Sequence, residues 1–598
     1  MSSIQGDEDS ELVQENNGND DNIESEESDA ESDNGSDWSQ RTQEYTFISN
    51  KLTEGSYQRI KNNDPDQTCL EIEFDDIRDR EDLPELGRLI GENTNLTKLR
   101  LLSDCNLDAV SWGDDDILQP NENYDDLCKG ISNNRSITTL SLGPCFDNSK
   151  AVKILTPLFV NSRLSILNIG LCTNERARQL SSALSRCDNP SLTSVFINGS
   201  TDYALTDDVG GDLIDVLSRH PLQKLTLKWT LIDRLSTIAL QDMLGDSGCK
   251  LKTLTLGSTE VDDTSLSFLA KGLARNNNGL EELNLKELSE HITDSGWHNF
   301  FFLLRHGNLT LKKLDLADNN IGNRGAVGLI NAFATNNKVE NLILNNNDIG
   351  DEGCAALGRG FGNNSSPVEL DMISNSSITT IGWQSLSSIV RGPHSGLREI
   401  NLAGNDSFDD DATIAWVKAL EESRNTRLRV FWLGGHEHVT SRGWKAITNL
   451  VCNKTSVDTV YDSNHTLTNI SNWMGVREDM MERDVPEDCY RILRRCMDLS
   501  SNFGQSIKES AKRKIIELYF MEGEANMKDL LDLDLNVLPH MIASIGFNKA
   551  TGRSHYLDMA KGRQSLLYQL FRAWPLLCDI KSNSKSKVLG SKRKMEGG

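Results

Sequence analysis

The stretch that decides the fold reads Leu311-Lys-Lys-Leu314-Asp-Leu316-Ala-Asp-Asn319-Asn-Ile321, and the same pattern returns as Val339-Glu-Asn-Leu342-Ile-Leu344-Asn-Asn-Asn347-Asp-Ile349. The alternating leucines predict a short strand with one buried face. The asparagine follows where the chain turns, so we expect its side chain to bond backbone groups there. The same frame recurs at further positions, which begin at Leu96, Ile137, Leu164, Leu192, Leu222, Leu251, Leu280, Pro367, Leu397, Leu428 and Val457.

The second half of several repeats has an aliphatic residue four positions before a glycine. A stretch with apolar residues at helical spacing follows, as in Gly325-Ala-Val-Gly-Leu-Ile-Asn-Ala-Phe333, and predicts a helix that packs on the sheet. We interpret the glycine as allowing close approach of helix and strand. The pairs are Ile292/Gly296, Ile321/Gly325, Ile349/Gly353, Ile378/Gly382 and Val439/Gly443.

The period near 28, the I-x-x-x-G start and the helix in each repeat resemble the ribonuclease-inhibitor-like class of leucine-rich repeats, over roughly residues 70 to 470. The resemblance implies an α/β solenoid of about thirteen repeats. It would form a horseshoe with parallel strands on the concave face and helices on the convex face. The class resembles protein inhibitors, receptor sensor domains and a GTPase-activating protein of nuclear transport alike, so it implies a fold more than a function.

Composition divides the chain into five parts. Residues 1–45 are rich in acidic and small polar side chains, and we expect a disordered acidic tail. Residues 46–95 are interpreted as an N-terminal cap or degenerate repeat, and residues 96–470 as the repeats, with an insertion at 103–121. The helical spacing of apolar residues in 471–580 predicts a helical cap or bundle. Residues 581–598 are polar and basic, which favours a second disordered tail.

Charge and motifs exclude several function classes. The formal net charge is -27, and an acidic chain is repelled by phosphate backbones and anionic lipid, so we expect neither a nucleic-acid nor a membrane partner. The twelve cysteines include no Cys-x-x-Cys pair, which favours reduced thiols and a cytoplasmic or possible nuclear location. No nucleotide, dinucleotide or zinc-protease motif occurs. We therefore expect no cofactor, no metal and no catalytic site.

The strand positions between the leucines point into the concavity and form the expected work surface. Lysines gather in its middle, and the frame at Val457 places Tyr461 beside Trp432 and His465 beside His436. Exposed aromatic side chains on a rigid surface are good anchors for a partner. The candidate partner-binding residues are Lys224, Lys228, Asn284, Lys286, Lys313, Asn341, Asn345, Trp432 and Tyr461.

These observations favour a non-catalytic scaffold or adaptor that binds a protein partner of unknown identity through the concave face. Two alternatives stay open. One is a small-GTPase regulator similar to the nuclear-transport activator, although the acidic tract resembles a carboxy-terminal one there and is amino-terminal here. The other is an enzyme with its site in residues 471–580, where mainly apolar helix faces occur. The oligomeric state is not indicated by the sequence.

Overall fold

The computed structural model describes residues 51–500 with gaps, together with Lys514. The longer gaps are 74–80, 103–122, 144–148, 200–206 and 471–484, and the others span one to four residues. Every described residue belongs to one compact unit. The predictions for residues 1–45, 103–121, 581–598 and most of 471–580 therefore concern residues outside the described part.

The described strands form one parallel sheet of thirteen strands that follow one another in chain order. Each strand pairs with the next, so that Asn341 of β10 lies between Lys313 of β9 and Glu369 of β11. The strands are β1 Cys69–Glu73, β2 Lys98–Leu102, β3 Thr139–Leu142, β4 Ile166–Gly170, β5 Ser194–Asn198, β6 Lys224–Lys228, β7 Thr253–Gly257, β8 Glu282–Asn284, β9 Lys313–Asp315, β10 Asn341–Ile343, β11 Glu369–Asp371, β12 Glu399–Asn401 and β13 Val430–Trp432.

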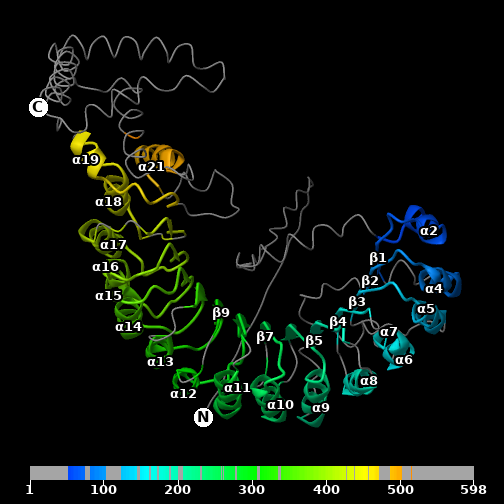
Figure 1. The fold of residues 1–598 in the computed structure, drawn as a ribbon. Coiled ribbons are helices and arrows are strands. Elements are labelled where there is room, and N and C mark those ends of the chain that lie inside the picture. Colours follow the sequence, from blue (N-terminus) through cyan, green and yellow to red (C-terminus); the bar gives the residue numbers. More distant parts are fainter. Residues whose placement is uncertain are drawn as a thin grey trace, which may run out of the picture. The chain divides into compact units, whose positions relative to one another are not determined.

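Helices connect the strands and lie along one side of the sheet, and no described helix lies over the other side between β6 and β12 (Figure 1). None in the described part is long and apolar enough to cross a bilayer. The helices are α2 Glu54–Lys61, α4 Leu83–Glu92, α5 Asn123–Ile131, α6 Ser149–Ile154, α7 Thr156–Phe159, α8 Asn174–Ser185, α9 Asp207–Leu217, α10 Arg234–Gly245, α11 Asp263–Arg275, α12 Asp294–Leu304, α13 Asn323–Phe333, α14 Asp351–Gly362, α15 Thr380–Leu386, α16 Ser388–Arg391, α17 Asp410–Glu422, α18 Ser441–Val451, α19 Val457–Asp462 and α21 Glu487–Ser500.

This alternation confirms the predicted α/β solenoid with an open parallel sheet. The core lies between the sheet and the helices, where the leucines of each frame, such as Leu314 and Leu316, are 0% exposed. Large aromatic side chains fill the helix side, with Trp297, Trp383 and Trp416 equally buried. Each repeat buries its apolar face on its neighbours, which is why the pattern can be repeated without a single central core.

A ladder of asparagines follows the strand ends, as predicted from Asn319 and Asn347. The Asn347 Nδ2 donates to the carbonyl oxygens of Leu316, Leu344 and Asn345 at 2.9, 3.1 and 3.1 Å. The Asn347 Oδ1 accepts the Ile321 N–H at 3.1 Å. Asn319, Asn375 and Asn405 make the equivalent bonds. The ladder therefore links each repeat to the one before it.

His436 takes the ladder position in the last of these repeats. Its Nδ1 lies 2.8 Å from the carbonyl oxygen of Asn405, and its ring stacks on Phe408 with centroids 4.9 Å apart. Burial lowers the pKa of His436 to about 4, so the ring is neutral at physiological pH. The imidazole thus replaces an asparagine in a structural role.

A second set of asparagines stands three residues before the first leucine of a repeat and was not predicted. The Asn134 Oδ1 accepts the Ile137 N–H at 2.8 Å, and its Nδ2 donates to the carbonyl oxygen of Ile90 at 2.7 Å. Asn93 and Asn425 make the same two kinds of bond. These side chains satisfy carbonyl groups at helix ends and thereby fix the turn into the next strand.

The recurring four-residue spacing between an aliphatic residue and a glycine has a different cause from the predicted one. The glycine is the third residue of its helix, and the side chain of the first residue of the preceding helix bonds the backbone beside it. The Asp410 Oδ1 accepts the N–H groups of Thr440 and Gly443, each at 2.9 Å. A Cβ on Gly443 would lie 2.6 Å from this oxygen. Glycine therefore leaves room for a carboxylate, and the interpretation as helix-to-strand approach was wrong.

We expect Asp410→Ala to lower the free energy of unfolding by about 1.5 kcal/mol, because a carboxylate at a helix N-terminus is removed along with its bonds. Its Oδ2 also accepts the Thr440 hydroxyl at 2.6 Å. The neighbouring Asp411→Ala provides a matched control, since Asp411 is exposed and only pairs with Arg442 at the surface. Urea unfolding monitored by circular dichroism should show a clearly smaller loss for the control. Equal losses would show that net charge, not the helix contact, matters.

The carboxy end of the sheet differs from the predicted frame. The strand predicted from Val457 is wrong, because Val457–Asp462 forms helix α19. The next strand-like pairing is a bridge between Val430 and Asn469. The frame instead restarts at Leu467, whose N–H bonds the Asn464 Oδ1 at 3.0 Å as Leu428 bonds Asn425.

Helix α21 lies beyond this bridge and packs against α18. Its apolar residues Cys489, Leu493 and Cys496 are at most 3% exposed. Lys514 is fully buried, and its Nζ donates to the carbonyl oxygens of Val451 and Asn464 at 3.2 and 3.1 Å. Helix α21 and Lys514 thus cover part of the last repeat.

Candidate functional site

The strand residues that alternate with the buried leucines form the open side of the sheet, which we call the inner face. Two columns of side chains cross it from β6 to β13, because the strands pair without a shift in register. The first column is Lys224, Thr253, Glu282, Lys313, Asn341, Glu369, Glu399 and Val430. The second is Thr226, Thr255, Asn284, Asp315, Ile343, Asp371, Asn401 and Trp432.

The predicted lysines lie toward the β6 to β9 part of the inner face and are half-buried. The Lys224 Nζ lies 5.1 Å from the centre of the Phe196 ring, a cation–π arrangement. The Lys286 Nζ lies 3.2 Å from Asp318 Oδ2. Lys228 ends β6 and Lys313 begins β9. The sheet therefore places these lysines on one face, with Lys286 held by a carboxylate of the next repeat.

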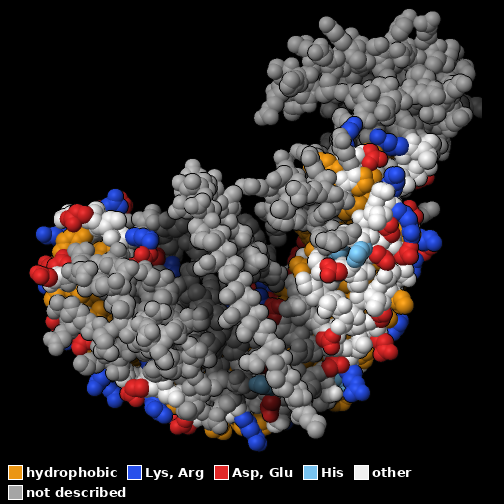
Figure 2. Space-filling view, turned by 180° about the vertical axis from the view of Figure 1, so that it is seen from behind, with side chains coloured by type: hydrophobic (Ala, Val, Ile, Leu, Met, Phe, Trp, Pro, Cys, Tyr) orange, Lys and Arg blue, Asp and Glu red, His pale blue; other side chains and the backbone are white. Residues whose placement is uncertain are grey.

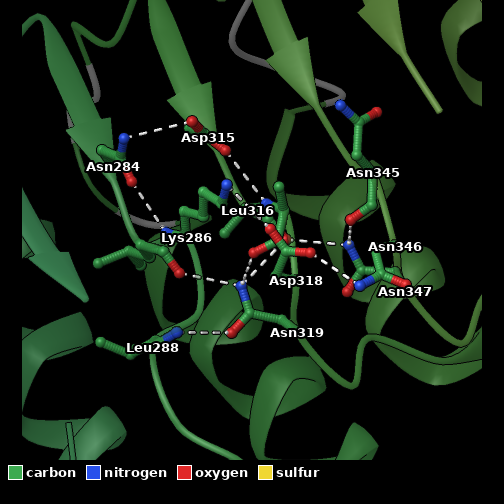
Figure 3. A network of polar contacts seen from close by, with 12 residues as sticks. Asn284, Lys286, Leu288, Asp315, Leu316, Asp318, Asn319, Asn345, Asn346 and Asn347 are labelled. Atoms are coloured by element: carbon green, nitrogen blue, oxygen red, sulfur yellow. Dashed lines mark hydrogen bonds and ion pairs between the residues drawn. The ribbon is translucent and has the colours of Figure 1, made fainter. Parts of the chain in front are cut away.

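A network of amides and carboxylates occupies the middle of the face (Figure 3). The Asn284 Nδ2 donates to Asp315 Oδ2 at 3.2 Å, and the Lys286 N–H donates to Asn284 Oδ1 at 2.9 Å. The other Asp315 oxygen accepts the Ala317 N–H at 3.1 Å. Burial raises the pKa of Asp315. These bonds fix the side chains and make this part of the surface rigid.

The two predicted asparagines of β10 and its following turn have different environments. Asn341 is half-buried, and its Nδ2 donates to Glu369 Oε2 at 2.9 Å. Asn345 is only 2% exposed, and its Oδ1 accepts the Ile373 N–H at 2.8 Å. Asn341 therefore lies at the surface, whereas the Asn345 side chain holds the neighbouring repeat.

The β11 to β13 part of the face carries three carboxylates beside an indole. Glu369 of β11 pairs in register with Glu399 of β12, and Asn401 of β12 with Trp432 of β13. The Trp432 Nε1 donates to Glu399 Oε1 at 2.7 Å, which fixes the ring orientation. We call Glu369, Asp371, Glu399 and Trp432 the acidic end of the inner face.

Two carboxylates of the acidic end, Asp371 and Glu369, have raised pKa values. Burial raises the pKa of Asp371 to about 7, against opposing hydrogen bonds from Asn345 and Ile373, and the nearby Asp315 and Glu399 add to the rise. Burial and the charge of Glu399 likewise raise the pKa of Glu369. Ionising Asp371 and Glu369 therefore costs free energy in the folded protein.

Comparison with known families identifies two of the repeats. The family described as "Leucine Rich repeat" matches residues 307–329 and 335–358, which contain the two best versions of the sequence pattern. The chain contains leucine-rich repeats. No curated protein matches the sequence. A solved structure described as "Crystal structure of Rad7 and Elc1 complex in yeast" is similar at 16% identity and a TM-score of 0.31, covering 68% of this chain and 93% of that chain.

The leucine-rich repeats place eight of the nine predicted partner-binding residues on strands β6 to β13 or directly after them. Tyr461 is the exception: it lies on helix α19, so the expectation that it stands beside Trp432 on a neighbouring strand was wrong. The same correction removes the expected stacking of His465 on His436. Asn464-x-x-Leu467 repeats the spacing of Asn425-x-x-Leu428, a signal that could have placed the last frame correctly.

The prediction also left out the carboxylates of the acidic end. Glu399 falls at the same position of the Leu397 repeat as Lys313 in its own repeat, so the frame could have placed it. Asp371 takes the same strand position in its repeat as Trp432 does in the Leu428 repeat, so the frame also places it on the inner face. The residues that bury Asp371 and act on its carboxyl group belong to other repeats. The sequence of its own repeat therefore does not reveal them.

Charged side chains elsewhere are more evenly mixed. Figure 2 shows acidic and basic side chains interspersed over the described surface visible in that view. Several form ion pairs between neighbouring repeats, such as Lys312 with Glu281 at 2.7 Å and Arg391 with Glu422 at 3.1 Å. Exposed pairs of this kind contribute little to stability or recognition. On the inner face from β6 to β13, the lysines lie toward β6 to β9 beside Glu282 and Asp315, whereas the two columns on β10 to β13 contain carboxylates and no lysine or arginine.

Proposed function

We propose that this protein is a non-catalytic scaffold or adaptor that binds a protein partner through the inner face of its leucine-rich repeats. The observation that carries the proposal is the rigid, polar sheet face, with lysines toward β6 to β9 and a fixed indole at the acidic end. Side chains held in place before binding lose little conformational entropy on binding. Trp432 is a partly exposed aromatic side chain, and such residues together with fixed polar groups often dominate binding energy.

The distribution of charge along the inner face supports recognition of an extended surface on the partner. Lysines lie toward β6 to β9, and the carboxylates Glu369, Asp371 and Glu399 lie on β11 and β12. A partner with charges in the reverse order would be oriented along the sheet by electrostatic complementarity. Leucine-rich repeats are repeat arrays, and such arrays provide long binding surfaces of this kind.

Affinity capture tests the proposal. The full-length chain is compared with a variant carrying Lys224→Glu, Lys228→Glu and Trp432→Ala, in lysate of the source cells. We expect partners retained by the parent chain to be lost by the variant, because two charges are reversed and an aromatic anchor is removed.

The matched control carries Arg359→Glu, Lys418→Glu and Ile381→Ala, which make the same kinds of change on exposed helix positions. Ile381 is 66% exposed, so its truncation creates no cavity. The control should retain the partners. Loss from the control, or retention by the inner-face variant, would place recognition away from the inner face and contradict the proposal.

A further inference from the structure

The acidic end contains more negative charge than the described part of the chain compensates. Asn341 donates to Glu369, and Trp432 donates to Glu399, so these carboxylates receive neutral donors. In the described residues, no lysine or arginine forms an ion pair with Glu369, Asp371 or Glu399. Elsewhere in the described residues, carboxylates pair with cations of a neighbouring repeat, as Asp318 does with Lys286.

Asp371 gives an independent indication of a missing donor. Its Oδ1 is buried and has no hydrogen-bond partner in the part of the chain that the structure describes. Buried polar atoms are nearly always bonded, and an exception calls for a physical reason. Leu370 and Met372 on either side face the core at 1% and 0% exposure, so the Asp371 side chain points to the inner face. The unsatisfied oxygen therefore belongs to the acidic end.

We propose that the acidic end binds the guanidinium group of an arginine in an extended segment of a protein partner. The inference deepens the proposed function and rests on it only in taking the occupant to be part of a protein. A guanidinium offers five N–H donors in a planar fork, which matches the two carboxylates Glu369 and Glu399 on adjacent strands, and the charge of the nearby Asp371 adds to the attraction. Strands about 4.8 Å apart place Glu369 and Glu399 at a suitable spacing.

Trp432 favours arginine over lysine. Its ring is fixed by the bond to Glu399, and a planar guanidinium stacks on an aromatic face while keeping its edge donors free for carboxylates. A lysine ammonium is a compact, strongly hydrated charge without this bidentate geometry. The site therefore discriminates between the two cations by shape as well as by charge.

Binding should depend on pH. A guanidinium favours the ionised carboxylate, and in the free protein burial holds the pKa of Asp371 at about 7. Affinity for the guanidinium should rise as the pH increases from about 6 to about 8, because a smaller fraction of Asp371 is protonated and has to release its proton on binding. From the neighbouring strands and their turns, Asn345, Asp315 and Glu399 act on the Asp371 carboxyl, and Asn401 pairs with Asp371 in register. Glu369 lies two residues away on the same strand.

Fluorescence anisotropy tests the inference with a labelled, acetylated and amidated hexa-arginine peptide and the full-length protein at physiological salt. Hexalysine and hexacitrulline peptides serve as probes of equal length, the first equal in charge and the second nearly equal in shape but neutral. We expect the arginine peptide to bind about tenfold more tightly than the lysine peptide, and the citrulline peptide not to bind.

The test variant carries Asp371→Asn and Glu399→Gln, and the matched control carries Glu352→Gln and Glu421→Gln on exposed helix positions. All proteins contain the acidic residues of the first forty positions, so that background binding is common to them. The test variant should lose about tenfold in affinity for the arginine peptide, and the control less than about twofold. Equal losses, or equal binding of arginine and lysine peptides, would overturn the inference.

The same variants separate this inference from the proposed function. If the Asp371→Asn, Glu399→Gln variant still captures the cellular partner and still binds the arginine peptide, the guanidinium site is absent, while the scaffold proposal stands. If the Lys224→Glu, Lys228→Glu, Trp432→Ala variant keeps its partners, the scaffold proposal fails whatever the peptide result. Loss of both peptide and partner from the Asp371 variant supports both.

Discussion

Replacing Asn347 with alanine is expected to lower the free energy of unfolding by about 4 kcal/mol. The side chain is 6% exposed and makes four hydrogen bonds to backbone groups of two repeats. Its removal leaves three carbonyl oxygens and one N–H without this partner in a place that water does not reach. Each orphaned group costs about 1 to 3 kcal/mol, less for a carbonyl that keeps a second bond.

Urea unfolding followed by far-ultraviolet circular dichroism measures the change, and hydrogen exchange shows where it acts. The Ile321 amide, which bonds Asn347, should exchange faster in the variant. Asn320→Ala is the control, because Asn320 is exposed and bonds only the carbonyl oxygen of Glu290 at 3.4 Å. We expect the control to change stability by less than about 0.5 kcal/mol. A similar small change for Asn347→Ala would mean that the ladder is not structural.

The asparagine ladder was predictable because one repeat contains the whole signal. The frame from Leu311 to Ile321 shows both the buried strand and the residue that bonds the turn, and its return at Val339 fixes the spacing. The bonds from Asp410 to the next helix were not predictable in the same way. There the glycine belongs to one repeat and the carboxylate that needs its space to the one before it.

The error at Val457 has a different origin. Val457-Asp-Thr-Val460 has apolar residues three positions apart, a spacing that fits a strand frame and a helix equally well in so short a run. The structure resolves the ambiguity through Asn464, which bonds the Leu467 N–H and so starts the frame ten positions later, 457 to 467. Because of that shift, Tyr461 is not the strand neighbour of Trp432.

The inner face was predictable in position but not in chemistry. Alternation along each strand shows that Lys313, Asp371 and Trp432 share one side of the sheet. Which of them are paired depends on residues about one repeat away, such as the Glu399 carboxylate that holds the Trp432 indole. Burial, which raises the pKa of Asp371, comes from the packing of several strands at once.

Replacing Asp371 with asparagine is expected to stabilise the protein by about 3 kcal/mol near pH 8 and to have little effect near pH 4. In the folded chain the pKa of Asp371 is about 7, above the ordinary value of 3.8. The folded state therefore binds more protons than the unfolded state between these values, and stability falls as the pH rises through them. A rise of roughly three pKa units corresponds to about 4 kcal/mol, from which about 1 is subtracted for a bond to Asn345 or Ile373 that asparagine cannot accept.

Urea unfolding at several pH values tests this expectation, with Glu352→Gln as a control that also removes one exposed negative charge. The stability difference between Asp371→Asn and the parent chain should grow from about pH 4 to about pH 7 and then level off. A difference that is constant with pH would show that Asp371 titrates normally. A stabilised variant that also loses the arginine peptide would mean that the carboxylate is kept for binding at the expense of stability, which is the relation expected of a functional residue.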